Sequence, residues 1–201
     1  QGIKQSHLLD AINAWGDTRL IVLGDTIVDQ YAACEAIGMS AEAPVVVVRE
    51  LERKNFIGGA AVVAAHISAL GAHCDFISVV GADSTAELVR QELAVQGIGN
   101  GLSADPSRPT TLKKRYVVEN QKLFRVSRLE EHNLDADVED QVIAQLQKLA
   151  PNADGIVVSD FVYGVVTPRI LEVVHQLAEQ HNLLLFGDLQ CSSQVGSVTR
   201  F

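Results

Sequence analysis

Short apolar runs alternate along the chain with segments that are apolar on one side only. The runs at 20–23, 76–80, 156–159 and 183–186 have the length and composition of buried strands. Amphipathic helical patterns fall between most of them. Because alternating strands and helices build βαβ units, this order predicts an α/β fold around a parallel sheet.

The helical segments carry recognisable start and stop signals. Ser84 and Glu87 have the spacing of a capping box. Thr167 followed by Pro168 supplies an N-cap and a first-turn proline. From such signals and from the apolar periodicity we expect helices over 60–70, 84–96, 138–149 and from 168 to about 181.

Two regions depart from this rhythm and predict a second, smaller sheet. The valines at 45–48 read as a strand, and so do 112–118 and 122–128. The last two are joined by the short turn Glu119-Asn120-Gln121, which predicts an antiparallel hairpin. We expect this small sheet to project from the main one.

Size and charge limit the classes of function. With 201 residues, of which 47% are hydrophobic, the chain suffices for one core, so we expect a single domain over 1–201. Its net charge is −9 and its basic residues are scattered, which argues against nucleic-acid and membrane partners. No apolar run approaches the roughly 20 residues of a membrane span, and 6–15 does not resemble a secretion signal. A cytoplasmic protein is expected.

The residue types that bind metals are spread without ligand spacing. Cys34, Cys74 and Cys191 lie far apart and are odd in number, which argues against a disulfide framework and a zinc site. The six histidines show no paired spacing either. We therefore expect buried thiols and no metal site.

Acidic residues follow several predicted strands. Asp25 and Asp29 come after the first strand, Asp160 ends the 156–159 run and Asp188 follows the 183–186 run. Ligands bind open α/β sheets at the carboxyl ends of their strands, where carboxylates accept hydrogen bonds from sugar hydroxyls. An acid in such a loop that only caps a helix or turn is the alternative.

Two further features are candidates for binding. Gly58 and Gly59 precede a helix of small residues, so a ligand can approach the backbone and the first helical N–H groups, although close packing of a turn explains the pair equally well. Arg115 and Arg125 lie on the two arms of the predicted hairpin, where they can meet and hold an anionic group. Protection of an edge strand from aggregation is the alternative for the arginines.

Common nucleotide-binding motifs are missing. The sequence contains no G-x-x-x-x-G-K-[ST], which excludes a P-loop. The glycine cluster at 97–101 does not complete G-x-G-x-x-G, and we expect no strand before it. A conventional dinucleotide site is not predicted.

Five stretches carry a family resemblance. They are LGDTIVDQY (23–31), SAEAPVVVV (40–48), GGAAVVAAHISALGA (58–72), LKKRYVVENQKLFRVSRLEE (112–131) and VVSDFVYGVVTP (157–168). In this order they resemble the ribokinase-like, or PfkB, carbohydrate kinases, and within them the heptose-7-phosphate kinase domain of bacterial ADP-heptose synthesis. The resemblance implies a Rossmann-like three-layer α/β/α core with a small β-sheet lid, here approximately 31–57 and 110–128, which often pairs with the lid of a second subunit.

The resemblance also implies roles for particular residues. Asp29, Gly58, Gly59 and Asp160 match family positions that contact sugar hydroxyls, and Asp188 is expected on the cofactor side. The implied reaction is ATP-dependent phosphorylation, with Mg²⁺, of a hydroxyl on a sugar or sugar phosphate. This chain is expected to supply the sugar-binding part of a homodimeric enzyme, with most of the ATP site beyond residue 201.

Several positions depart from the family pattern. Val62 stands where family members commonly have asparagine, Tyr163 where the heptose kinases have lysine, and Asp188-Leu189-Gln190 where they have Asp-Pro-Lys. The GAGD motif, whose aspartate is the family's general base, is absent from these 201 residues, so we expect the chain alone to be inactive. A non-catalytic sugar-binding or regulatory relative is the alternative, and a nucleoside kinase of the same fold is a third reading.

Overall fold

The computed structural model describes residues 4–190, which form two sheets. The main sheet has five strands in the order β5-β4-β1-β8-β9, and every neighbouring pair is parallel. Its strands are β1 (Arg19–Gly24), β4 (His73–Val80), β5 (Gly99–Ala104), β8 (Gly155–Asp160) and β9 (Leu184–Leu189). The parallel sheet is confirmed, but β5, which includes Gly99 and Gly101 of the glycine cluster, was not predicted as a strand.

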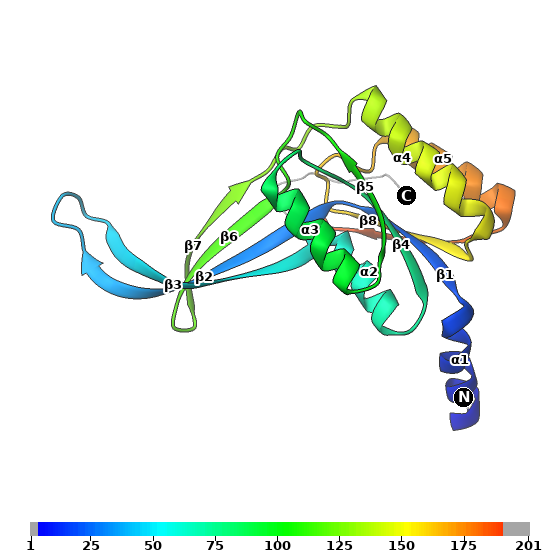
Figure 1. Cartoon of the computed structure of the whole chain (residues 1–201), viewed down its shortest axis with the longest axis horizontal. Helices are drawn as coiled ribbons and strands as arrows, with labels where there is room; N and C mark the ends of the chain where they lie inside the picture. Colours follow the sequence, from blue (N-terminus) through cyan, green and yellow to red (C-terminus); the bar gives the residue numbers. More distant parts are fainter. Residues whose placement is uncertain (1–3, 191–201) are drawn as a thin grey trace.

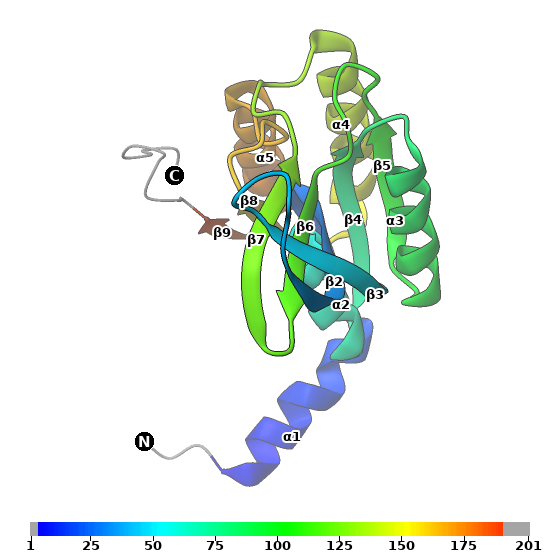
Figure 2. The same ribbon diagram turned by 90° about the vertical axis from the view of Figure 1, so that its left-hand side faces the viewer.

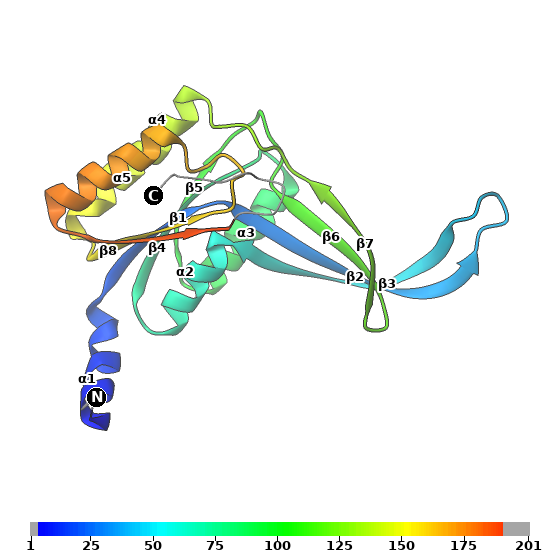
Figure 3. The same cartoon turned by 180° about the vertical axis from the view of Figure 1, so that it is seen from behind.

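Helices cover both faces of this sheet, so the core has three layers (Figures 1 and 3). They are α2 (Ala60–Ala69), α3 (Ser84–Val95), α4 (Ala136–Leu149) and α5 (Pro168–His181), with a 3₁₀ turn η2 (Ala150–Asn152) after α4. Val22 and Phe76 pack with α2 and α3 on one face. Ile21 and Ile156 pack with α4 and α5 on the other. The α/β/α architecture expected from the sequence is confirmed.

Of the two predicted helix-start signals, one is confirmed and one is wrong. The Thr167 side chain accepts a hydrogen bond from the Ile170 N–H at 3.2 Å, so it caps α5 as expected. The helix α4 begins two residues earlier than predicted. The capping box at Ser84 is wrong, because the N-cap of α3 is Asp83, whose Oδ1 accepts from the Ala86 N–H at 3.0 Å. Asp83 is held there by Thr110, whose hydroxyl donates to the same oxygen.

The second sheet has four strands in the order β3-β2-β6-β7 and extends from the core (Figure 1). Its strands are β2 (Thr26–Met39), β3 (Val46–Gly59), β6 (Leu112–Val118) and β7 (Gln121–Arg128). The predicted hairpin of β6 and β7 is confirmed as antiparallel. The β2–β3 hairpin continues past β6, because β6 pairs with β2 between Val28 and Cys34 and leaves the outer part of the hairpin as a two-stranded arm.

The boundary after β1 differs from the prediction, and this changes the position of Asp29. The stretch after β1 is not a loop, since β2 begins at Thr26 and leaves Asp25 alone between the two strands. The chain therefore passes from the main sheet into the second sheet almost without interruption. As a result Asp29 lies within β2 of the second sheet and not at the edge of the main one.

The N-terminal helix stands apart from the core. Helix α1 (Gln5–Ala14) and the 3₁₀ turn η1 (Trp15–Asp17) have no buried residues and project from the molecule (Figure 2). Leu8, Leu9 and Ile12 are each about half exposed. Within residues 4–190, no helix has the length and apolar character needed to cross a bilayer.

Candidate functional site

The paired glycines are required by the way β2, β3 and α2 meet. A Cβ atom on Gly58 would lie 2.7 Å from the Asp29 carboxylate. Gly59 has a φ of +66°, and a Cβ there would collide with the carbonyl oxygen of Asp25. That carbonyl accepts the N–H of Ala60, the first residue of α2, at 2.9 Å. The glycines thus bring the start of α2 against Asp25 and Asp29.

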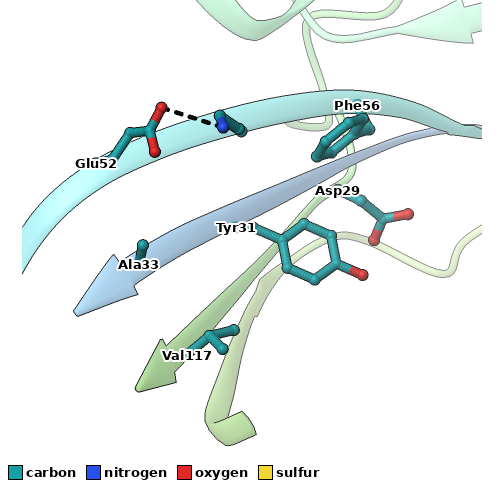
Figure 4. A pocket seen from close by; sticks show the side chains of 7 residues that line it. Asp29, Tyr31, Ala33, Glu52, Phe56 and Val117 are labelled. Carbon is teal, nitrogen blue, oxygen red and sulfur yellow. Dashed lines mark ion pairs between the residues drawn. The ribbon is translucent and has the colours of Figure 1, made fainter. Parts of the chain in front are cut away.

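A cavity of about 580 Å³ opens on the same face of the second sheet as Asp29. Tyr31 and Phe56 form its aromatic wall, with ring centroids 5.8 Å apart and an interplanar angle of 83°. Figure 4 shows both rings near Asp29, with the Glu52–Lys54 ion pair (3.3 Å) at the other end. The lining residues are Asp29, Tyr31, Ala33, Glu52, Lys54, Phe56 and Val117.

The two predicted arginines lie on this face. Arg115 forms an ion pair with Asp29, and its guanidinium carbon lies 5.4 Å from the centroid of the Tyr31 ring. Arg125, which is exposed, is the register partner of Arg115 on β7. Asp29 is therefore already paired with a cation, and an incoming hydroxyl or anion would share that pair.

Lys113 connects the second sheet with the loop that follows β8. It is the register partner of Asp29 on β6. Its ammonium nitrogen lies 5.0 Å from the centroid of the Tyr163 ring, a cation–π distance. Tyr163 therefore contacts the second sheet at Lys113, the residue that is paired with Asp29.

Asp25 and Asp160 are buried together at the carboxyl ends of β1 and β8. Asp25 accepts backbone hydrogen bonds from Phe161 (2.8 Å) and, over longer distances, Tyr163 (3.4 Å) and Val165 (3.3 Å). Burial and then the charge of Asp160 raise the pKa of Asp25 to about 6, against the lowering effect of these three bonds. Asp25 was recognised in the sequence as an acid at a strand end, but not as a site residue.

The acids at strand ends do not all converge as predicted. Asp25 and Asp160 come together, and Asp29 reaches the site from the second sheet. Asp188 lies near the end of the edge strand β9, is exposed, and accepts the Gln190 amide at 2.8 Å on both carboxylate oxygens. The convergence of three strand ends on one ligand is therefore only partly realised.

Within residues 4–190 there is no cluster of metal ligands, and the residue expected on the cofactor side already has a side-chain partner. Asp188, the residue expected on the cofactor side, has both oxygens engaged by Gln190. Within 4–190 no group of three or more His, Cys, Asp or Glu side chains is placed to hold a metal ion. We therefore derive no step through ATP or Mg²⁺ from this part of the chain.

A buried arginine that was not predicted from the sequence, Arg108, is hydrogen-bonded to the loop that carries Tyr163. Arg108 pairs with Asp105 at 2.7 Å and donates to the carbonyl oxygens of Tyr163 (3.0 Å) and His132 (2.9 Å). Although burial acts to raise the pKa of Asp105, hydrogen bonds from Ser107 and Arg108 bring it below its usual value. The residues around Arg108 read as an ordinary loop, and no local pattern marks an arginine that will be buried.

Comparison with known proteins identifies the family. The model of the pfkB family carbohydrate kinases matches residues 17–194, so this chain belongs to that family, as the resemblance implied. Its curated relatives include the D-beta-D-heptose 7-phosphate kinase of Bordetella bronchiseptica, 39% identical over 85% of this chain and 53% of the relative. The bifunctional protein HldE of Bradyrhizobium sp. is 37% identical over 77% of this chain and 32% of the relative. The chain thus spans about half of the first relative and a third of the second.

Solved structures with the same fold are more distant in sequence. Phosphofructokinase-2 from Escherichia coli, in complex with fructose-6-phosphate, has a TM-score of 0.65 at 16% identity and covers 86% of this chain and 55% of its own. Arabidopsis thaliana ribokinase, complexed with ribose and ATP, has a TM-score of 0.59 at 15% identity and covers 90% and 54%. These likenesses show the ribokinase-like fold.

Proposed function

We propose that this chain supplies the sugar-binding part of a kinase that transfers phosphate from ATP, with Mg²⁺, to a hydroxyl of a sugar or sugar phosphate. The observation that carries the proposal is the position of Asp29, between the paired glycines and an open cavity. A carboxylate placed there can accept hydroxyl hydrogens, and the aromatic wall beside it suits the apolar face of a sugar ring. Membership of a carbohydrate kinase family supports this reading.

The proposed sugar contacts are those predicted from the sequence. Asp29 and the backbone around Gly58 and Gly59 would bind hydroxyls from the second sheet. Asp160 would bind from the core, although its carboxylate also accepts the Val162 N–H at 2.7 Å. Arg115 and Arg125 would then face an anionic substituent such as a phosphate.

A sugar phosphate fits these side chains better than a neutral sugar. Arg115 lies on the Asp29 face, with Arg125 as its register partner and Lys54 at the far end of the cavity. The relatives named for heptose 7-phosphate make that compound the first probe. A nucleoside, which lacks a phosphate, offers these cations no anionic ligand group.

Binding measurements test the proposal directly. Isothermal titration calorimetry with heptose 7-phosphate, fructose 6-phosphate, ribose and adenosine should give measurable affinity for at least one sugar phosphate. Ribose and adenosine should bind at least tenfold more weakly. Tightest binding of adenosine would favour the nucleoside kinase, and no binding by any probe would contradict a sugar site.

A non-catalytic relative is the second candidate, because no G-[AG]-G-D sequence occurs in residues 1–201. The two candidates differ in what the intact protein contains. Sequencing the coding region downstream of Phe201 separates them, since a kinase requires that motif opening a helix and a purely binding relative does not.

Two features of the whole protein belong to the same proposal. The second sheet, approximately 31–57 and 110–128, would act as a lid over the sugar, and a second copy of the chain would cover its exposed apolar side chains. Location in the cytoplasm is also part of the proposal.

A further inference from the structure

Asp25 is not one of the proposed sugar-binding residues. It is, however, hydrogen-bonded to the segments that carry several of them. The residue is 1% exposed, and its carboxylate accepts the three N–H groups of Phe161, Tyr163 and Val165. Its carbonyl oxygen accepts the N–H of Ala60, next to Gly59. One residue therefore connects the loop after β8 with the start of α2.

The loop at 161–165 has an unusual backbone that these bonds sustain. Val162 has a φ of +64°, a left-handed conformation that a β-branched residue rarely adopts. Gly164 has a φ of +94°, and a Cβ on it would collide with the carbonyl oxygen of His132. Because the residues around the loop hold it in this path, its N–H groups point at Asp25 and Asp160.

The path of the loop decides where two groups of the candidate site lie. The Val162 N–H fixes one oxygen of Asp160. The ring of Tyr163 is placed under the ammonium group of Lys113, while Arg108 holds the Tyr163 carbonyl from the other side. A shift of the loop would therefore move Asp160 and the contact between the core and the second sheet together.

We propose that Asp25 is a positioning residue of the sugar site, whose ionised carboxylate keeps loop 161–165 in the arrangement that binds and whose protonation releases it. The proposal rests on the proposed function. The three donors use both oxygens of Asp25, and a neutral carboxyl replaces one good acceptor by an O–H donor. Protonation of Asp25 therefore weakens the hydrogen bonds that keep the loop in place.

The surroundings of Asp25 place this change near neutral pH. The charged side chain that acts on Asp25 is Asp160, and the other groups that contact its carboxylate are the backbone N–H groups of Phe161, Tyr163 and Val165. Since the pKa of Asp25 is about 6, it takes up a proton between pH 7 and 5. Because its folded pKa exceeds the unfolded value, this protonation stabilises the fold as pH falls. Loss of binding in this range is thus distinct from acid unfolding.

Asp25→Asn tests the proposal, because asparagine has the shape of the neutral carboxyl. We expect wild type to bind heptose 7-phosphate at least tenfold more tightly than D25N at pH 7.5. The ratio of the two dissociation constants should approach one at pH 5, with its midpoint near pH 6. The ionisation of the probe's own phosphate affects both proteins equally and cancels in this ratio. Asp154→Asn is the matched control, since Asp154 accepts a backbone N–H, that of Arg19, at the opposite edge of the sheet.

Amide hydrogen exchange gives a readout that needs no ligand. In D25N the amides of Phe161, Tyr163 and Val165 should exchange at least tenfold faster at pH 7.5, while those within α4 keep their wild-type rates. Should D25N not fold, the protection factors of the same amides in wild type should fall at least tenfold between pH 7.5 and 5.

The outcomes separate this inference from the proposed function. Equal affinities of wild type and D25N at pH 7.5, or a ratio that does not change with pH, would overturn the positioning role while the sugar site stands. Unchanged exchange of the loop amides would overturn it independently. If wild type binds no probe while the loop amides respond as expected, the sugar site fails, and with it the sugar-positioning role.

Discussion

The ion pair between Asp29 and Arg115 places opposite charges at the point where a sugar would bind. Asp29 can accept hydroxyl hydrogens and Arg115 can donate to a phosphate, so each of the two has a ligand group of its own. Without a ligand they satisfy one another. A ligand would therefore share this pair, and the two residues should act jointly.

Replacing Asp29 by alanine tests how much this residue contributes to ligand binding. A charge-assisted hydrogen bond contributes about 1.5–3 kcal/mol, so we expect D29A to weaken binding of a sugar phosphate at least tenfold in calorimetry. The control is Glu35→Ala, because Glu35 lies on the same strand and also pairs with an arginine, Arg49, on the exposed arm. Combining D29A with Arg115→Ala should give less than the sum of the two losses. Unchanged affinity in a folded D29A would remove Asp29 from the site.

Single residues show how far the sequence could predict the site. Asp29, Gly58 and Gly59 come together, but through the pairing of β2 with β3, which the local sequence pattern did not predict. The roles of Asp25 and Arg108 could not be predicted, since each depends on partners more than 20 residues away in the sequence. Burial of a charged group follows from tertiary packing, and no periodic pattern in the sequence indicates it.

At the scale of elements, two predictions from local sequence signals are confirmed. Helix α5 begins at its predicted cap, and the β6–β7 hairpin forms at its predicted turn. Strand β2 was missed because its sequence, TIVDQYAACEAIGM, contains alanines and acids that favour strands weakly. It forms because β3 and β6 pair with it on both sides. Strand β5, with two glycines, is likewise determined by pairing with β4.

The junction of β3 and α2 allows a test of why its glycine is needed. Gly59 and Gly71 both have positive φ, but a Cβ on Gly71 would meet open space while one on Gly59 would strike Asp25. Left-handed backbone alone costs an alanine about 1–2 kcal/mol. We therefore expect Gly71→Ala to lose about that much stability in urea unfolding, and Gly59→Ala to lose at least about 1 kcal/mol more. Equal losses would show that the collision is relieved without cost.

At the scale of the whole molecule, the outer part of the β2–β3 hairpin is an arm of only two strands. Two strands alone are marginally stable in water. The arm nevertheless exposes Ile37, Met39, Val46 and Leu51, each more than half exposed. The adjoining β7 exposes Phe124 and Val126, which are register partners of Tyr116 and Lys114. Because side chains alternate along a strand, Phe124 and Val126 lie on the face opposite Lys113, Arg115 and the cavity.

A second copy of the chain covering this face would shield the apolar side chains and leave the cavity open. Phe124, stacked on Tyr116 with ring centroids 4.7 Å apart, is a central residue of that face. We expect light scattering to show a dimer at tens of micromolar, and Phe124→Glu to give a monomer that binds sugar phosphate poorly, since a loosened sheet no longer holds Arg115 beside Asp29. Val95→Glu is the control, because Val95 is an apolar residue of α3 that is 82% exposed on the core. A monomeric wild type, or a dimer that survives Phe124→Glu, would contradict this arrangement.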